Sequence, residues 1–196
     1  MTLVGGLPGA GKSTLAQGLA TANGWRLLRT DEIRHELAGV DLGAAPSFGQ
    51  GRYSPDATEA TYVELLHRAR ELVAHGESVV LDASWMDDGL RARARTIAAD
   101  CHTELFEICC EARSDVAARR IESRLARQDD PSEATPEIRQ AMARSVKPWG
   151  SATHIDTTTR TPAETLAVAV ADLERSRLGD GQDEQLHRLE RADLRP

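Results

Sequence analysis

Residues 6–13 read Gly-Leu-Pro-Gly-Ala-Gly-Lys-Ser, and this segment constrains the fold of the chain more than any other. It matches the pattern G-x-x-x-x-G-K-[ST], in which glycines let backbone N–H groups converge on phosphate oxygens. An apolar run at residues 2–6 precedes the glycines, and an amphipathic stretch at residues 12–22 follows them. The sequence therefore predicts a phosphate-binding loop at a strand-to-helix turn, with the positive end of the helix dipole directed at the anion.

Within this loop, the residue types suit contacts with a nucleoside triphosphate. The Lys12 side chain is long enough to reach the β- and γ-phosphates of ATP, and the Ser13 hydroxyl is a ligand for Mg²⁺. A chance glycine-rich turn is the alternative, but ordinary residue frequencies give only roughly 0.01 such matches in a chain of this length. The residues expected to contact ATP here are Gly6, Pro8, Gly9, Ala10, Gly11, Lys12, Ser13 and Thr14.

Beyond the loop, short apolar runs alternate with longer amphipathic stretches, which predicts an α/β fold with a parallel sheet covered by helices. Hydrophobic residues make up 40% of the chain and aromatic residues only 4%, so the core must be aliphatic. The Gly-rich residues 39–53 are expected to form a functional or mobile loop. We expect the domain to span residues 1–175, followed by a charged, flexible tail at residues 176–196. The further strands are expected at residues 25–29, 78–81, 104–110 and 153–155.

Charge and composition restrict the partners of the chain. A formal net charge of −7 argues against general binding to nucleic acid, which needs a basic surface. No apolar run approaches the ~18 residues of a membrane span and there is no signal peptide, so we expect a cytoplasmic protein without a membrane partner. Cys101, Cys109 and Cys110 lack the spacing of a metal site, and the vicinal pair Cys109–Cys110 is expected to be buried in a reduced protein. The first strand begins almost at Met1, which suggests a domain cut from a longer chain or a trimmed N-terminus.

Two carboxylates follow predicted strands, at the edge where parallel sheets bind their ligands. Asp31 could accept the proton of an attacking hydroxyl, or it could simply cap the helix that follows. Arg34, one turn on, could clamp a polar or anionic group of the phosphate acceptor. Asp82 ends an apolar run in the Walker B manner and is expected to hold Mg²⁺, with Ser84 on the acceptor side. The sequence does not decide which aspartate lies nearer the metal.

Arg120, Arg124 and Arg127 recur on one face of a predicted helix, at i, i+4 and i+7. Like charges at this spacing repel by roughly a few tenths of a kcal/mol per pair, so the helix itself gains nothing from them. A triphosphate opposite would explain them, because one guanidinium could stack on adenine and another could stabilise the transferring phosphoryl group. A solvated basic face is the alternative. The polar break at residues 128–132 favours a lid, with Arg120 and Arg124 as nucleotide ligands and Arg124 as a catalytic group.

The last predicted strand leads into residues 156–158, in a loop that a parallel sheet would place beside the P-loop. Asp156 and Thr157 are therefore expected near the adenine base, with plain turn formation as the alternative. Lys147 precedes this strand, and a surface position suits it better than a phosphate contact.

The motifs at residues 6–13, 30–34, 81–85, 120–124 and 130–135 occur in a recognisable order. Together they resemble the small P-loop kinases grouped with gluconate kinase, chloramphenicol phosphotransferase, zeta toxin and the polynucleotide kinase domain. The resemblance is closest to the C-terminal ATP-binding domain of predicted bifunctional aminoglycoside phosphotransferase-like/ATP-binding proteins. It covers about residues 2–173 and implies a P-loop NTPase fold: a three-layer α/β/α sandwich with a five-stranded parallel sheet in the order 2-3-1-4-5.

The resemblance also implies roles for individual residues. Asp31 matches the general base or acceptor ligand of such kinases, and Arg120 and Arg124 match their lid arginines. An N-terminal kinase-like domain, not seen in this chain, is an implied partner. The acceptor is not implied, because members of such families phosphorylate different molecules.

Three functions are compatible with these features. The leading hypothesis is a phosphotransferase that moves the γ-phosphoryl group of ATP–Mg to a hydroxyl of a small molecule, with Lys12, Asp31 and Arg124 as catalytic residues. The second is a nucleotide-binding regulatory module of a larger kinase-like protein, without phosphotransfer of its own. The third is phosphorylation of a nucleic-acid 5′-hydroxyl, which the acidic net charge argues against.

Overall fold

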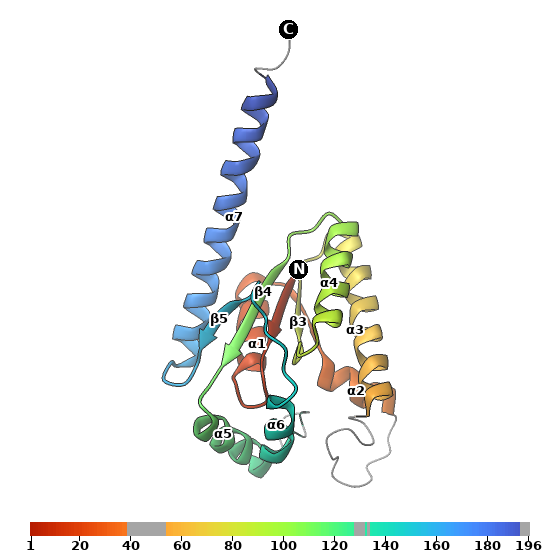
Figure 1. The fold of residues 1–196 in the computed structure, drawn as a ribbon, viewed down its shortest axis with the longest axis vertical. Coiled ribbons are helices and arrows are strands. Elements are labelled where there is room, and N and C mark those ends of the chain that lie inside the picture. The colour runs from red at the N-terminus through yellow and green to blue at the C-terminus, as the bar shows by residue number, and fades with distance from the viewer. Residues whose placement is uncertain (39–53, 128–131, 133, 193–196) are drawn as a thin grey trace.

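The computed structural model describes residues 1–38, 54–127, 132 and 134–192, and a parallel five-stranded sheet forms its centre (Figure 1). The strands are β1 (Thr2–Gly5), β2 (Arg26–Arg29), β3 (Val79–Asp82), β4 (Phe106–Glu111) and β5 (Thr153–Asp156). Their order is β2-β3-β1-β4-β5, which confirms the predicted sheet. Because β1 pairs with both β3 and β4, the loop that follows β1 leaves the sheet between the ends of two neighbouring strands.

Helices connect the strands in the described part of the chain. In chain order they are α1 (Lys12–Asn23), α2 (Thr30–Ala38), α3 (Pro55–Ala74), α4 (Asp88–Asp100), α5 (Ser114–Arg127), α6 (Pro136–Ala143) and α7 (Pro162–Ala192). On one face of the sheet α1 and α7 pack through aliphatic side chains such as Leu19 and Leu173, and on the other face α3 and α4 pack through Leu65 and Ala94. The result is the predicted three-layer α/β/α sandwich, with α5 and α6 at the carboxyl ends of the strands (Figure 1).

Capping residues fix where α3 and α7 begin. The Ser54 hydroxyl accepts a hydrogen bond from the Ala57 N–H (3.2 Å) at the start of α3. At the start of α7, the Thr161 hydroxyl accepts from the Glu164 N–H (3.2 Å) and the Glu164 carboxylate accepts from the Thr161 N–H (2.8 Å). This reciprocal pair is the expected capping box.

The C-terminal segment, expected to be a charged, flexible tail, continues α7 as far as Ala192 (Figure 1). The boundary at residue 175 and the flexibility of the tail stay predictions. The expected loop at residues 39–53 and residues 128–131 of the expected lid break lie outside the described residues, as does residue 133. Among the described helices, none combines the length and apolar character needed to cross a membrane.

Candidate functional site

The loop between β1 and α1 adopts a backbone that requires glycine at two positions. Gly6 has a φ of +132°, and a side chain there would overlap the Cys110 carbonyl of β4. Gly9 has a φ of +76°, and a Cβ there would lie 2.5 Å from the Ala117 carbonyl of α5. Gly11 precedes α1 without offering a side-chain cap, so the N–H groups of the first turn remain available to an anion. The predicted strand–loop–helix arrangement is confirmed.

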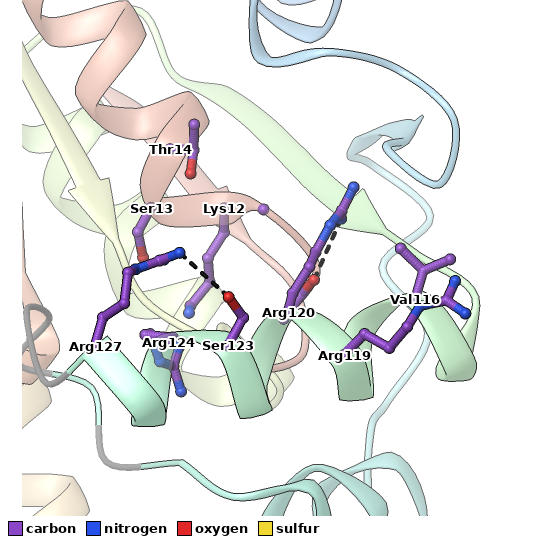
Figure 2. A pocket seen from close by; sticks show the side chains of 11 residues that line it. Lys12, Ser13, Thr14, Val116, Arg119, Arg120, Ser123, Arg124 and Arg127 are labelled. Atoms are coloured by element: carbon purple, nitrogen blue, oxygen red, sulfur yellow. Dashed lines mark hydrogen bonds between the residues drawn. The ribbon is translucent and has the colours of Figure 1, made fainter.

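A cavity of about 610 Å³, the first cavity below, opens between this loop and α5 (Figure 2). Its loop side consists of Gly9, Gly11 and residues 12–14 at the start of α1. Its other side consists of residues on one face of α5: Val116, Arg119, Arg120, Ser123, Arg124 and Arg127. The predicted arginine stripe therefore faces a helix N-terminus across an open space, an arrangement that suits a ligand with several phosphate groups.

Two of these arginines also hold neighbouring segments in place. Arg120 donates from Nη1 to Thr157 Oγ1 (2.9 Å), from Nη2 to the Thr157 carbonyl (2.7 Å) and more weakly to the Gly9 carbonyl (3.4 Å). Arg124 donates from Nη2 to the Ala134 carbonyl (2.9 Å), and its buried Nε has no hydrogen-bond partner among the described residues. Arg124 thus retains hydrogen-bonding capacity beside the first cavity, whereas Arg120 bridges the loop and the segment after β5.

Lys12 lies at the junction of two cavities. Its side chain is only 9% exposed, and it is the one described residue that lines both the first cavity and a second cavity of about 350 Å³. The second cavity contains the predicted acceptor-side residues Asp31, Arg34 and Ser84. Lys12, the predicted phosphate ligand, therefore lies in the wall of the cavity that contains the predicted acceptor-side residues.

Asp31 lies in the first turn of α2, which begins at Thr30, so it is not the N-cap residue of that helix. Burial raises the pKa of Asp31, but the charges of Lys12 and Arg34 and hydrogen bonds from Ser132 and Arg34 outweigh burial and bring the pKa below its ordinary value of 3.8. The carboxylate is therefore ionised at neutral pH and can accept a proton or orient a hydroxyl. Ser132, in the segment expected to form a lid, therefore lies within hydrogen-bonding distance of this carboxylate.

Asp82 ends β3 beside the strand that leads into the loop, in register with Val4. Its Oδ2 accepts a hydrogen bond from Arg29 Nε (3.2 Å), an ion pair that the sequence did not predict. Its Oδ1 is buried and has no hydrogen-bond partner among the described residues. An orphaned carboxylate oxygen and the Ser13 hydroxyl in the first cavity are donors that fit Mg²⁺.

The two residues predicted near adenine lie behind the loop. Thr157 is buried, and it donates from Oγ1 to the Ala10 carbonyl (2.9 Å) and from its N–H to the Glu111 carbonyl (2.8 Å). Asp156 is exposed, and its side chain accepts a hydrogen bond from the Thr158 N–H (2.8 Å). This contact is the plain turn formation given above as the alternative to an adenine contact. Neither Thr157 nor Asp156 is among the described residues that line the first cavity. Contact with adenine stays a prediction, while Thr157 ties the end of β5 to the loop.

Three residues of the loop face other spaces. Pro8 lines the second cavity, while Gly6 and Ala10 line a third cavity of about 450 Å³ behind the loop. The Pro8 carbonyl accepts a hydrogen bond from Arg139 Nη1 (2.6 Å) of α6, and Arg139 Nη2 donates to the Ala112 carbonyl (3.1 Å). Arg139, which the sequence did not identify, therefore fastens α6 to the loop, and the nucleotide contacts of Gly6, Pro8 and Ala10 stay predictions.

Tyr62 is a second residue that sequence reasoning missed, because its position in the apolar stripe of α3 indicated packing alone. Its hydroxyl lies 3.1 Å from Ser84 Oγ and accepts from the Trp85 N–H (3.0 Å). Trp85 is fully buried and has a φ of +51°, so Tyr62 supports a strained turn at the wall of the second cavity. The polar tip of a buried tyrosine usually finds a partner, which is the signal that could have indicated this role.

The vicinal cysteines lie apart from the first and second cavities. Cys110 is buried, as predicted, whereas Cys109 is partly exposed. Burial raises the pKa of Cys109 to about 11 and that of Cys110 to about 12, as expected for unreactive thiols. The pairing of β4 with β5 brings Cys109, Glu111 and His154 within reach of a shared metal ion, which the spacing of these residues in the sequence does not reveal. Both ring nitrogens of His154 already have protein partners, the Glu111 carboxylate (2.7 Å) and the Trp149 carbonyl (2.9 Å). Protein contacts alone therefore explain this group.

The fold and the loop with its two adjoining cavities define a P-loop α/β protein. The chain belongs to the AAA domain family, whose model matches residues 1–149. It is 43% identical over 159 residues to uncharacterised proteins of Mycobacterium tuberculosis and Mycobacterium bovis. This match covers 80% of the chain but 31% of those relatives, so the chain spans about a third of their length.

Solved structures of P-loop small-molecule kinases share the fold. A gluconokinase from Sinorhizobium meliloti 1021 superimposes with a TM-score of 0.67 at 19% identity, covering 94% of this chain and 95% of its own. The APS kinase CysC of Mycobacterium tuberculosis, solved in complex with AMPPNP and APS, superimposes with a TM-score of 0.63 at 24% identity, covering 88% and 96%. The predicted fold and the predicted resemblance to this group of kinases are both confirmed.

Proposed function

We propose that the first cavity binds ATP with Mg²⁺ and that the γ-phosphoryl group passes to a hydroxyl of a small molecule in the second cavity. The position of Lys12 in the walls of both cavities is the observation that supports this most. A γ-phosphate held by Lys12 would face the cavity that contains the ionised Asp31. The kinase fold of the solved neighbours, one of them crystallised with AMPPNP, favours the same assignment.

In the proposed reaction, the acceptor hydroxyl oxygen bonds to the γ-phosphorus while the bond from that phosphorus to the β–γ bridging oxygen breaks, and ADP leaves. Asp31 accepts the proton of the hydroxyl, and the Arg34 ion pair keeps that carboxylate in place. Loop N–H groups and Lys12 hold the phosphates, and Arg124 stabilises charge on the transferring group. Ser13 and Asp82 would hold Mg²⁺, which supplies further neutralisation of phosphate charge when bound.

Transfer of label from γ-³²P-ATP to pooled hydroxyl compounds tests the proposal. Asp31→Asn is expected to lower kcat by roughly 10²–10⁴-fold, because the general base is lost, while the Kd for ATP changes by less than about threefold. Asp100→Asn, the same change at an exposed position at the end of α4, is the control and should retain wild-type kcat. An Asp31→Asn variant with wild-type kcat would contradict the proposal.

A nucleotide-binding regulatory module is the second candidate, and the length of the relatives favours considering it. Since those proteins are about three times as long as the matched segment, another part of such a protein could carry the activity that ATP binding controls. In a full-length protein, this function predicts that Lys12→Ala abolishes activity while Asp31→Asn leaves it unchanged. Equal loss in both variants would exclude the regulatory function. A kinase-like domain N-terminal to this one is the partner proposed in that case.

A further inference from the structure

The second cavity has a polar end, where it meets Lys12 and Asp31, and a mainly apolar body. Away from that end, the described lining is formed mainly by apolar side chains from the loop, α3, the turn after β3, α4, the lid segment and α6. These residues are Pro8, Pro55, Tyr62, Met86, Leu90, Ala134 and Met142. Because they come from six separate segments, the apolar wall surrounds the space and is not the exposed stripe of a single helix.

Most polar groups in the body of this cavity are already engaged with protein partners, the Thr58 hydroxyl being the exception among the described residues. Glu59 accepts a hydrogen bond from Arg93 (2.5 Å), and Asp87 accepts one from Lys147 (2.8 Å). The Tyr62 hydroxyl is held by its two contacts in the turn after β3. A ligand in this part of the cavity therefore meets carbon and sulfur far more often than an open hydrogen-bonding group.

Resting on the proposed function, we infer that the phosphate acceptor carries its reactive hydroxyl on a largely apolar body, such as an aromatic or alicyclic ring, and is not a sugar or other polyol. The hydroxyl would face Asp31, and the ring would lie against Met86, Leu90 and Met142. A polyol would bring further hydroxyl groups out of water without regaining their hydrogen bonds, which disfavours its entry. The flexible thioethers of two methionines adapt well to an apolar ring.

Methionine methyl signals in NMR spectra can test this inference directly. The chain has three methionines: Met86 and Met142 line the second cavity, and Met1 lies at the opposite, amino end of β1. In ¹³C-methyl-methionine protein saturated with Mg–AMPPNP, benzyl alcohol and cyclohexylmethanol should shift the Met86 and Met142 signals saturably and leave Met1 unchanged. Glucose and myo-inositol should need a roughly tenfold or higher concentration for half-saturation. A polyol that saturates at the lower concentration, or no saturable shift with either ring alcohol, would overturn the inference.

A polar substitution in the wall provides an independent measurement. Leu90→Asn places an amide in the cavity and should raise the half-saturating concentration of benzyl alcohol roughly tenfold. Leu37→Asn, the same change at a 51% exposed position of α2, is the matched control and should leave this concentration unchanged. Met86→Gln, read through Met142, gives a second variant if Leu90→Asn does not fold. Wild-type binding by both cavity variants would contradict the inference.

Label transfer from γ-³²P-ATP separates the two proposals. Ring alcohols that bind in the second cavity but receive no label would defeat the proposed phosphotransfer and support the inferred ligand class. Labelled polyols together with unlabelled ring alcohols would support phosphotransfer and overturn the inferred class.

Discussion

Replacing Thr157 with valine is expected to loosen the phosphate-binding loop while leaving the shape of its surroundings nearly unchanged. The Thr157 hydroxyl donates to the Ala10 carbonyl (2.9 Å) and accepts from Arg120 Nη1 (2.9 Å). Valine has a similar volume but can make neither hydrogen bond. The Ala10 carbonyl therefore loses its side-chain donor, and Arg120 keeps only its bonds to the Thr157 and Gly9 carbonyls.

The expected loss of stability follows from these two hydrogen bonds. Removing a neutral hydrogen bond costs about 1 kcal/mol, and removing one to a charged group costs about 1.5–3 kcal/mol. Because Arg120 retains two acceptors, the lower end of this range applies, and the free energy of unfolding should fall by about 2.5 kcal/mol. In a domain of this size, such a change lowers Tm by about 5–10 °C.

Urea unfolding measures the loss of stability, and calorimetric titration with ATP and GTP measures the effect of the loosened loop on nucleotide affinity. The two nucleotides should lose affinity by similar factors, because the loop is disturbed and the base is not. Thr159→Val, the same change at an exposed position two residues on, is the control and should change the free energy of unfolding by less than about 0.5 kcal/mol. A Thr157→Val variant as stable as wild type would refute the anchoring role. A loss of affinity confined to ATP would instead identify Thr157 as an adenine contact.

Three further outcomes are expected. Gly9→Ala should weaken ATP binding roughly tenfold or more, because its Cβ would lie 2.5 Å from the Ala117 carbonyl at a φ of +76°; wild-type affinity in a calorimetric titration would contradict this. The pKa of Asp31 is lowered in the folded protein, so its contribution to stability is present above its unfolded-state pKa and is lost as the pH falls through its folded-state pKa. Because the carboxylate stays ionised throughout the range, Asp31 should produce no inflection in kcat/KM between pH 5 and 8. An inflection in that range that disappears in Asp31→Asn would refute this prediction. With pKa values of about 11 and about 12, Cys109 and Cys110 should resist iodoacetamide at pH 8 in the folded protein, and peptide mass spectrometry showing labelling as fast as in guanidinium would argue against the buried state.

The sequence was informative where structure depends on residues that are neighbours in the chain. The glycines and lysine of the P-loop predicted a strand–loop–helix turn because few other sequences permit that backbone. Ser54 and the pair Thr161–Glu164 predicted helix starts because a cap acts within one helical turn. The arginine stripe predicted one face of α5, since residues three and four apart lie on the same side of a helix.

Contacts between distant segments could not be predicted in this way. Arg139 reaches the Pro8 carbonyl across 131 residues, and Arg29 pairs with Asp82 across 53 residues. No local pattern indicates which carbonyl or carboxylate will lie opposite such an arginine. Proximity to the loop suggested an adenine role for Thr157, but proximity alone does not show which way a side chain points.

The C-terminal helix shows how tertiary context can outweigh a local signal. Glycines at positions 179 and 181 and many charges favoured a flexible tail. The surrounding residues are mostly good helix formers, and α7 is already established by its packed N-terminal part. Extension of an existing helix is far easier than nucleation of a new one, so the helix continues through these glycines.

A crystal structure of the chain with Mg–AMPPNP tests most directly whether the two cavities hold the two halves of one reaction. We expect the triphosphate against the loop N–H groups of residues 9–13, with the γ-phosphate beside Lys12 and directed into the cavity that contains Asp31. A triphosphate bound away from the loop, or a γ-phosphate turned away from Asp31, would contradict the proposed phosphoryl transfer.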